Sequence, residues 1–264
     1  MTIGKVAVIG GTGFYKLLMT EGHTEIELNT LYGSVYLDRF NIAGKEVYFL
    51  ARHGKEHSIP PHMINYRANV AALEILSVDV VIATAAVGSL RSEINTGAMV
   101  LIDQFIDFTK ARKGTFYDGC NGEVVHVDVT EPYCPAVRQI IKAAARQKGY
   151  ELLDGGCYIC TEGPRFETPA EIKMMARWGG DLVGMTNVPE VVLAREAGLC
   201  YATIALVTNM AAGVSETPLN HEEVLMAMEQ LGKSVADLIL CFLRSPVTKE
   251  ACTCSIHLRN NERG

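Results

Sequence analysis

Short apolar runs typical of strands alternate with segments of helical periodicity along most of this 264-residue chain. The alternation restricts the fold more than any other feature, because it favours a sheet covered by helices on both faces. A chain of this length can form such a sheet as one large domain. The expected strands are Val6–Ile9, Val35–Leu37, Val47–Leu50, Val80–Thr84, Met99–Ile102, Asp181–Met185 and Thr203–Val207. The expected helices include Asn65–Leu76, Pro135–Lys148, Pro169–Trp178 and Glu190–Ala197. The pattern therefore predicts an α/β fold, with Val35–Leu37 in a hairpin near one edge of the sheet.

A final helix is predicted from an apolar stripe near the carboxyl end. Asn220 is placed to cap it, and Glu222 and Glu223 lie in the first turn, where acidic groups suit the helix dipole. The apolar residues that recur with helical spacing are Val224, Leu225, Met228, Leu231, Val235, Leu238, Ile239 and Phe242. The pattern stops at Ser245. We therefore expect one domain over residues 1–244 and a polar, poorly anchored tail over residues 245–264.

Charge and hydropathy exclude several classes of partner. The net charge of −6 gives no reason to expect nucleic-acid binding, which favours a basic surface. An anionic substrate would need local positive groups against this overall charge. The amino terminus lacks the apolar core of a signal peptide, and no apolar run reaches the ~18 residues that a membrane helix needs. The expected location is the cytoplasm.

The chain carries eight cysteines, and their settings differ. Six lie in or beside apolar stretches and are expected to be buried thiols: Cys120, Cys134, Cys157, Cys160, Cys200 and Cys241. Cys157 and Cys160 have CxxC spacing, but a second pair is lacking and the segment is typical of a strand. Cys252 and Cys254 are expected to form an exposed, reduced pair in the tail, with a redox or disulfide role left open. No metal site is predicted.

Gly10-Gly11-Thr12-Gly13 follows the first expected strand. Glycines there let the backbone approach an anion closely, and successive amides can point at it. The run is not a dinucleotide fingerprint, because Lys16 stands where the third glycine of GxGxxG belongs. The alternative is a glycine turn that only ends the strand.

Polar or small residues also follow three other expected strands. Arg52 and His53 follow the expected strand that ends at Leu50, and the arginine fork suits a tetrahedral oxyanion while the histidine adds a donor. Ala85 and Ala86 stand in a run of small residues that offers backbone amides, and Thr186 contributes a hydroxyl. The alternative interpretation is a surface arginine beside a histidine whose hydrogen bonds are made within the protein. Because strand ends meet at one edge of an α/β sheet, these residues predict a single anion site.

Phe166, Glu167 and Asn209 have the chemistry of a base-binding site. A carboxylate can accept hydrogen bonds from the edge of a base while the aromatic ring packs on its face. The amide of Asn209 can donate to a ring nitrogen as negative charge develops on the leaving base. The alternatives are a helix-capping carboxylate at Glu167 and a turn residue at Asn209.

Three separated segments then agree in order and in type with a known family. They are Gly-Pro-Arg-Phe-Glu-Thr at 163–168, Gly-Met-Thr-Asn-Val-Pro-Glu at 184–190 and Val-Thr-Asn-Met-Ala-Ala-Gly at 207–213. The chain resembles the trimeric nucleoside phosphorylases, the family of purine nucleoside phosphorylase and methylthioadenosine phosphorylase, from about Lys5 to about Leu243. The resemblance implies a single-domain three-layer fold with a central mixed sheet, assembled as a homotrimer or a dimer of trimers.

The resemblance also assigns roles to individual residues. It implies phosphate ligands at Thr12, Arg52, His53, Ala85, Ala86 and Thr186. It implies nucleoside contacts at Phe166, Glu167, Met185, Asn209, Ala211 and His221, with Asn209 and His53 as catalytic residues. His126 aligns with a residue that family members donate across the subunit boundary, although a solvated loop histidine is the alternative. Met185 would lie under the ribose.

Donor and acceptor chemistry favours a particular base. A 6-oxopurine carries hydrogen on N1, which Glu167 would accept, whereas the bare N1 of adenine would leave this carboxylate unpaired. In the adenine-specific members of the family that this chain resembles, an aspartate stands at the position of Asn209. His221 is similar to the residue that contacts the 5′-hydroxyl in the purine branch, while the Ala-Arg-His-Gly form around Arg52 resembles the methylthioadenosine branch.

We therefore expect phosphorolysis of inosine and guanosine to free purine and ribose 1-phosphate, without a metal or organic cofactor. S-methyl-5′-thioinosine or S-methyl-5′-thioadenosine phosphorolysis is the alternative on the same scaffold. Hydrolysis of the same bond would not need Arg52, His53 and Thr12 to converge. A nucleoside-binding regulator would bind purine without forming a phosphate-dependent product.

Overall fold

The computed structural model describes residues 3–11, 22–120, 122–215, 221–245 and 254–255, and the side chains of all of these except 221–228. Within these residues, eleven strands form one mixed sheet. They are β1 (Lys5–Gly10), β2 (Thr24–Thr30), β3 (Gly33–Ile42), β4 (Lys45–Ala51), β5 (Val80–Ser89), β6 (Met99–Leu101), β7 (Gln104–Phe108), β8 (Leu153–Asp154), β9 (Cys157–Thr161), β10 (Leu182–Gly184) and β11 (Cys200–Met210). The helices are α2 (Tyr66–Ile75), α3 (Pro135–Lys148), α4 (Pro169–Arg177), α5 (Glu190–Glu196) and α6 (His221–Arg244), with a short 3₁₀ turn η1 (Pro61–Met63).

The sheet runs in the order β2-β3-β4-β1-β5-β10-β9-β7, and β11 pairs with β5 and β6. Its centre is parallel: β5 lies between β1 and β11, and β4 follows β1 in the same direction. These strands are apolar on both sides because helices cover both faces. The antiparallel strands β2 and β3 extend the sheet at one edge.

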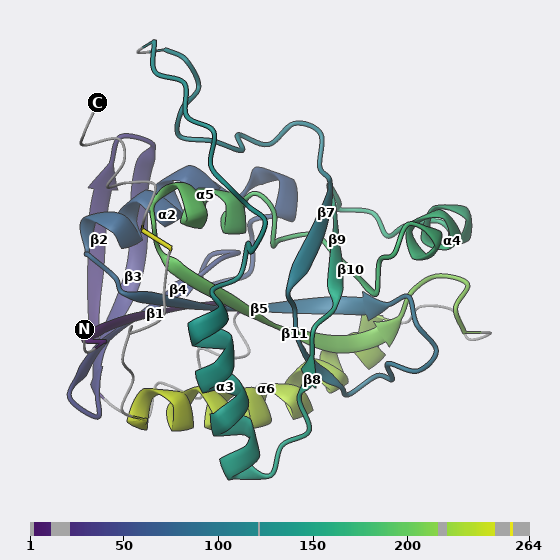
Figure 1. The fold of residues 1–264 in the computed structure, drawn as a ribbon. Helices are drawn as coiled ribbons and strands as arrows, with labels where there is room; N and C mark the ends of the chain where they lie inside the picture. Colours follow the sequence, from purple (N-terminus) through teal and green to yellow (C-terminus); the bar gives the residue numbers. More distant parts are fainter. Residues whose placement is uncertain (1–2, 12–21, 121, 216–220, 246–253, 256–264) are drawn as a thin grey trace.

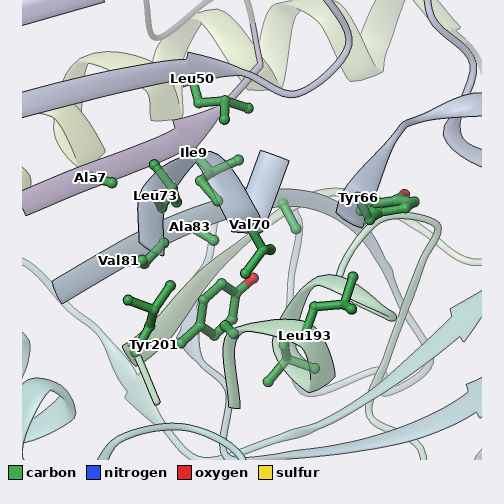
Figure 2. Packing of buried hydrophobic residues seen from close by; sticks show 14 of the residues in the cluster. Ala7, Ile9, Leu50, Tyr66, Val70, Leu73, Val81, Ala83, Leu193 and Tyr201 are labelled. Carbon is green, nitrogen blue, oxygen red and sulfur yellow. The ribbon is translucent and has the colours of Figure 1, made fainter. Parts of the chain in front are cut away.

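Helices α2 and α5 lie on one face of the sheet, and α3 and α6 lie on the other (Figure 1). Two cores result. One packs β1 and β5 side chains against α2 and α5, as Figure 2 shows for Ile9, Val70, Leu73 and Leu193. The other buries Val137 of α3 and the part of the α6 stripe from Leu231 to Phe242. The predicted three-layer α/β architecture is confirmed.

Several strand boundaries differ from the sequence prediction. The segment Val35–Leu37 is only the middle of β3, which pairs with β2 along its length. Strands β2, β7 and β8 were not expected from the apolar pattern because most of their side chains are only partly buried or exposed. The strand interpretation of the CxxC segment is confirmed by β9.

The largest boundary difference concerns the two central strands. Strand β5 continues to Ser89 and β11 to Met210, beyond the predicted ends at Thr84 and Val207. Ala85 and Ala86 therefore lie inside β5, and Asn209 lies inside β11, rather than in loops after the strands. The two strands pair with each other over this extension. This pairing continues both strands through small residues, which do not by themselves indicate a strand.

The predicted helices are confirmed within one or two residues at each end. Asn65 caps α2 by accepting from the Ala68 amide at 3.1 Å, and Thr168 and Glu171 form a capping box at α4. Where the side chains of α6 are described, the stripe residues are buried, as predicted: Leu231, Val235, Leu238, Ile239 and Phe242. The expected cap Asn220 lies outside the described residues. Among the described helices, none combines the length and apolar character needed to cross a membrane.

Candidate active site

One cavity of about 270 Å³ opens where β4, β5, β10 and β11 present polar or small residues. It is lined by ten of the residues singled out from the sequence. One set, here the Arg52 group, consists of Arg52, His53, Ala85, Ala86 and Thr186. The other, here the Glu167 group, consists of Phe166, Glu167, Met185, Asn209 and Ala211. The two sets of residues therefore line one shared cavity, whereas their binding roles stay predictions.

Arg52 is almost completely buried, at 3% exposure, and its guanidinium is held from three sides. Nε and Nη2 donate to the two carboxylate oxygens of Glu190 at 2.7 and 2.8 Å, and Nη1 donates to the Thr84 carbonyl at 2.8 Å. Such a two-pronged pair fixes the plane of the guanidinium. The N–H groups that remain on Nη1 and Nη2 are the ones that an anion in the cavity can use.

Glu190 is the partner that sequence reasoning missed. It lies at the start of α5, is fully buried, and also accepts from the Tyr201 hydroxyl at 2.7 Å. Burial acts to lower the pKa of Arg52, but the charge and hydrogen bonds of Glu190 outweigh it, so this pKa is raised. The one sequence signal for this buried carboxylate was a glutamate inside the otherwise apolar segment Val188–Leu193.

His53 differs from its expected role as a donor. Its Nδ1 lies 2.8 Å from the Ile59 carbonyl oxygen, and because a carbonyl only accepts, Nδ1 carries the hydrogen. Burial lowers the pKa of His53 to about 4, the bond to Ile59 opposes this, and the charge of Arg52 adds to it. The ring is therefore neutral at pH 7, and Nε2 is an acceptor suited to the hydrogen of a protonated oxyanion.

The charge of the Arg52 group is thus already balanced. Glu190 neutralises Arg52, and His53 is neutral. Ala85 is buried, and Thr186 is 9% exposed with its amide donating to the Tyr158 hydroxyl at 3.2 Å. An anion here would be held by directed N–H and O–H groups rather than by an excess of positive charge.

Asn209 is oriented by an irregularity in β11. The register of β11 against β5 shifts between Val207 and Asn209, and a bulge of this kind re-aims the side chain that follows it. The Asn209 side-chain oxygen accepts from the Thr208 hydroxyl at 2.9 Å, and its nitrogen donates to the Met210 carbonyl at 3.0 Å. One hydrogen on that nitrogen remains for a ligand.

The absence of a side chain at Gly88 leaves room for this arrangement. A Cβ there would lie 3.1 Å from the Asn209 side-chain nitrogen and 3.3 Å from Val183. Gly163 has a similar role, since its φ is +66° and a Cβ would meet the Met185 sulfur at 2.6 Å. Met185 therefore packs directly against the turn that leads to Phe166 and Glu167.

Phe166 and Glu167 lie on the loop between β9 and α4, and they are less enclosed than Arg52. The Phe166 ring is 52% exposed, and Glu167 is half-buried. One carboxylate oxygen of Glu167 accepts from the Thr161 hydroxyl at 2.7 Å. Capping of α4 is performed by Thr168 and Glu171, so the capping alternative for Glu167 is wrong.

Three predicted residues are not placed in the cavity. Thr12 lies outside the described residues, and the side chain of His221, the first residue of α6, is likewise not described. His126 is exposed on the long segment between β7 and α3 and does not line the cavity. Its role across a subunit boundary stays a prediction.

The cysteines correct part of the sequence prediction. Cys120 is exposed rather than buried, and Cys254 is 2% exposed rather than on a loose end. Cys254 packs with Cys134 and Cys200, and the three sulfur atoms lie within 4.8 Å of one another in the core beneath α3 and α6. None of the three lines the cavity. Cys252 lies outside the described residues.

Comparison of the sequence with known families agrees with this fold and cavity. The model of the family described as "Phosphorylase superfamily" matches residues 5–244, and the chain belongs to that family. The match covers the whole sheet and all five α-helices of the described residues, so the resemblance stated from three segments is confirmed.

Two relatives and one solved structure are similar to the chain over more than nine tenths of its length. A protein of Moorella thermoacetica named "Probable 6-oxopurine nucleoside phosphorylase" is 51% identical, over 96% of this chain and 97% of its own length. A protein of Methanopyrus kandleri named "Probable S-methyl-5′-thioinosine phosphorylase" is 47% identical, over 98% and 99%. The solved structure of methylthioadenosine phosphorylase from Schistosoma mansoni in complex with adenine superposes with a TM-score of 0.86 at 35% identity, covering 91% of each chain.

Proposed function

We propose that this protein catalyses phosphorolysis of 6-oxopurine nucleosides, converting inosine or guanosine and phosphate into the free base and ribose 1-phosphate. The carrying observation is the single cavity that joins the buried Arg52 to Glu167 and Asn209. An oxyanion site beside a carboxylate–amide pair fits a reaction between phosphate and a keto purine. The names of the 51% identical and 47% identical relatives support a 6-oxopurine base.

The proposed chemistry breaks the C1′–N9 bond and forms a bond from C1′ to a phosphate oxygen. As the sugar acquires oxocarbenium character, phosphate held by Arg52 stabilises it electrostatically and then attacks C1′. The electron pair of the broken bond goes to the purine, where the free N–H of Asn209 stabilises it. Nε2 of the neutral His53 accepts a hydrogen bond from monohydrogen phosphate. The proton of that phosphate ends on the purine anion, so the products are the neutral purine and the ribose 1-phosphate dianion. We propose that the reaction uses no metal and no organic cofactor.

The 5′-methylthio nucleoside of the same base is the second candidate. The relative from Methanopyrus kandleri favours it by name, and the base would make the same contacts with Glu167 and Asn209. The proposed 5′-hydroxyl contact at His221 separates the two candidates.

We further propose a homotrimer in which His126 of one subunit reaches the site of its neighbour, in keeping with its exposure on a long loop.

A substrate panel at fixed phosphate tests the proposal. Initial rates are measured for inosine, guanosine, adenosine, S-methyl-5′-thioinosine and S-methyl-5′-thioadenosine, with separation of the released bases. We expect inosine and guanosine to give the highest kcat/KM. A preference for adenosine would contradict the role of Glu167, and exclusive use of methylthioinosine would contradict the role of His221.

A further inference from the structure

The two oxygens of the Glu167 carboxylate are not equivalent. Oε1 accepts a hydrogen bond from the Thr161 hydroxyl at 2.7 Å, and this is the one hydrogen bond to Glu167 among the residues that the structure describes. Glu167 lines the cavity of the Arg52 group, whereas Thr161 lines a neighbouring cavity of about 270 Å³ that Glu167 also lines. Oε2 is therefore the oxygen left for a ligand, and Oε1 is held by a residue outside the cavity of the Arg52 group.

Thr161 is itself held in place. It is the last residue of β9 and is 8% exposed. Its carbonyl accepts from Arg112 Nη2 at 3.0 Å, and the same guanidinium donates to the carbonyls of Glu162 and Val188 at 2.9 and 2.6 Å. The Arg112 side chain is 2% exposed. The strand end that presents the Thr161 hydroxyl is thus fixed by a buried cation with several partners.

The direction of the Thr161 hydrogen bond has a chemical consequence. The nearest competing acceptor is the Gly184 carbonyl at 3.4 Å, so the shorter contact to Glu167 takes the hydrogen. The Thr161 hydroxyl thus occupies Oε1 as a donor, and the carboxylate keeps Oε2 as a second hydrogen-bond acceptor. Glu167 is thereby prepared for a base that offers N1–H and not for a base whose N1 is bare.

We propose that Thr161 is a positioning residue for base selection: by donating to Glu167 Oε1 it presents Oε2 as an acceptor for the N1–H of 6-oxopurines. This inference rests on the proposed function, since it names the group that orients the proposed base-binding carboxylate. It assigns the choice between hypoxanthine and adenine to a pair of residues, one of which the substrate does not touch. Guanine fits the same arrangement through its own N1–H.

The chain offers a matched control for this contact. Thr115 donates to Oε1 of Glu196 at the same distance of 2.7 Å, and neither residue lines the cavity. Replacing either threonine with valine removes one hydroxyl–carboxylate hydrogen bond while keeping the shape of the side chain. A general structural effect of losing such a bond appears in both variants, whereas an effect on base selection appears in Thr161→Val alone.

The experiment compares wild type, Thr161→Val, Thr161→Ser and Thr115→Val with inosine and adenosine at saturating phosphate. We expect Thr161→Val to lower kcat/KM for inosine about tenfold, mainly through KM, with a smaller change for adenosine. The inosine-to-adenosine ratio then falls about tenfold, returns to within about twofold in Thr161→Ser, and is unchanged in Thr115→Val. Equal losses for both nucleosides, or a ratio that Ser does not restore, would overturn the inference.

Binding of the free bases separates this inference from the proposed reaction. Calorimetric titration with hypoxanthine and adenine needs no turnover, so selectivity can be measured even if phosphorolysis is absent. We expect Thr161→Val to lose selectivity for hypoxanthine, and retained selectivity would refute the role of Thr161. Where Thr161→Val does not fold, Thr161→Cys supplies a weaker donor and is expected to lower the ratio about threefold, and an unchanged ratio there counts against the role equally.

Discussion

The Arg52 group and the Glu167 group line one cavity but are built in different ways. The Arg52 group lies on or directly after central strands, and its arginine is buried and bonded to a buried carboxylate. Phe166 and Glu167 lie on a loop, with the aromatic ring half-exposed and the carboxylate held by one hydroxyl. In the function that we propose, phosphate, which every substrate shares, is held by residues of the central strands, whereas Phe166 and Glu167 contact the base from a loop.

The largest expected effect is that of Arg52→Ala. Removing the cation leaves Glu190 buried without its charged partner, which costs roughly 3–5 kcal/mol in the free energy of unfolding. We also expect KM for phosphate to rise on the order of 100-fold, because a charged donor to the oxyanion is lost. Urea denaturation and phosphate titration measure the two effects.

Arg39→Ala is the control for Arg52→Ala. Arg39 pairs with Glu46 at 3.6 Å on the surface, and its side chain is 47% exposed. We expect a change below about 1 kcal/mol in the free energy of unfolding and no change in KM for phosphate. Similar destabilisation by the two variants would contradict the distinction between a buried and an exposed ion pair.

Asn209→Asp is expected to have the next largest effect, confined to the base. The new carboxylate still accepts from Thr208 but no longer donates to the Met210 carbonyl or to the purine. We expect kcat/KM for inosine to fall about 100-fold, since the donor to the developing negative charge becomes a negative group. An equal loss of phosphate affinity would show that the two groups do not act separately.

Much of this arrangement follows from local sequence, and some of it does not. The convergence of Arg52, His53, Glu167 and Asn209 on one cavity was predictable because strand ends with polar residues meet at one edge of an α/β sheet. The Glu190 partner was not, because 138 residues separate it from Arg52 and only the pairing of strands brings them together. The bulge that aims Asn209 depends on the register of β11 against β5, which has no local signal.

Phe166→Ala is expected to have a smaller effect. The ring is 52% exposed, so its removal should change the free energy of unfolding by less than about 0.5 kcal/mol. We expect KM for inosine to rise about three- to tenfold through lost packing on the base, with phosphate KM unaltered. A large loss of stability would mean that this loop belongs to the core after all.

The smallest effect concerns pH. Because the pKa of His53 is lowered to about 4 in the folded protein, the unfolded chain binds a proton between its ordinary pKa near 6.5 and pH 4 while the folded protein does not. This histidine therefore reduces stability progressively as pH falls through that window. In His53→Gln, we expect a shallower decline of the melting temperature from pH 6.5 to 4. An identical pH dependence would contradict the neutral state assigned to His53.

In the reaction that we propose, one cavity brings phosphate and a keto purine nucleoside together. The most direct test follows inosine cleavage as phosphate is raised from zero, with quantification of hypoxanthine, ribose 1-phosphate and free ribose. We expect no hypoxanthine without phosphate, and equal amounts of hypoxanthine and ribose 1-phosphate with it. Hypoxanthine released at a rate independent of phosphate, together with free ribose, would contradict the claim.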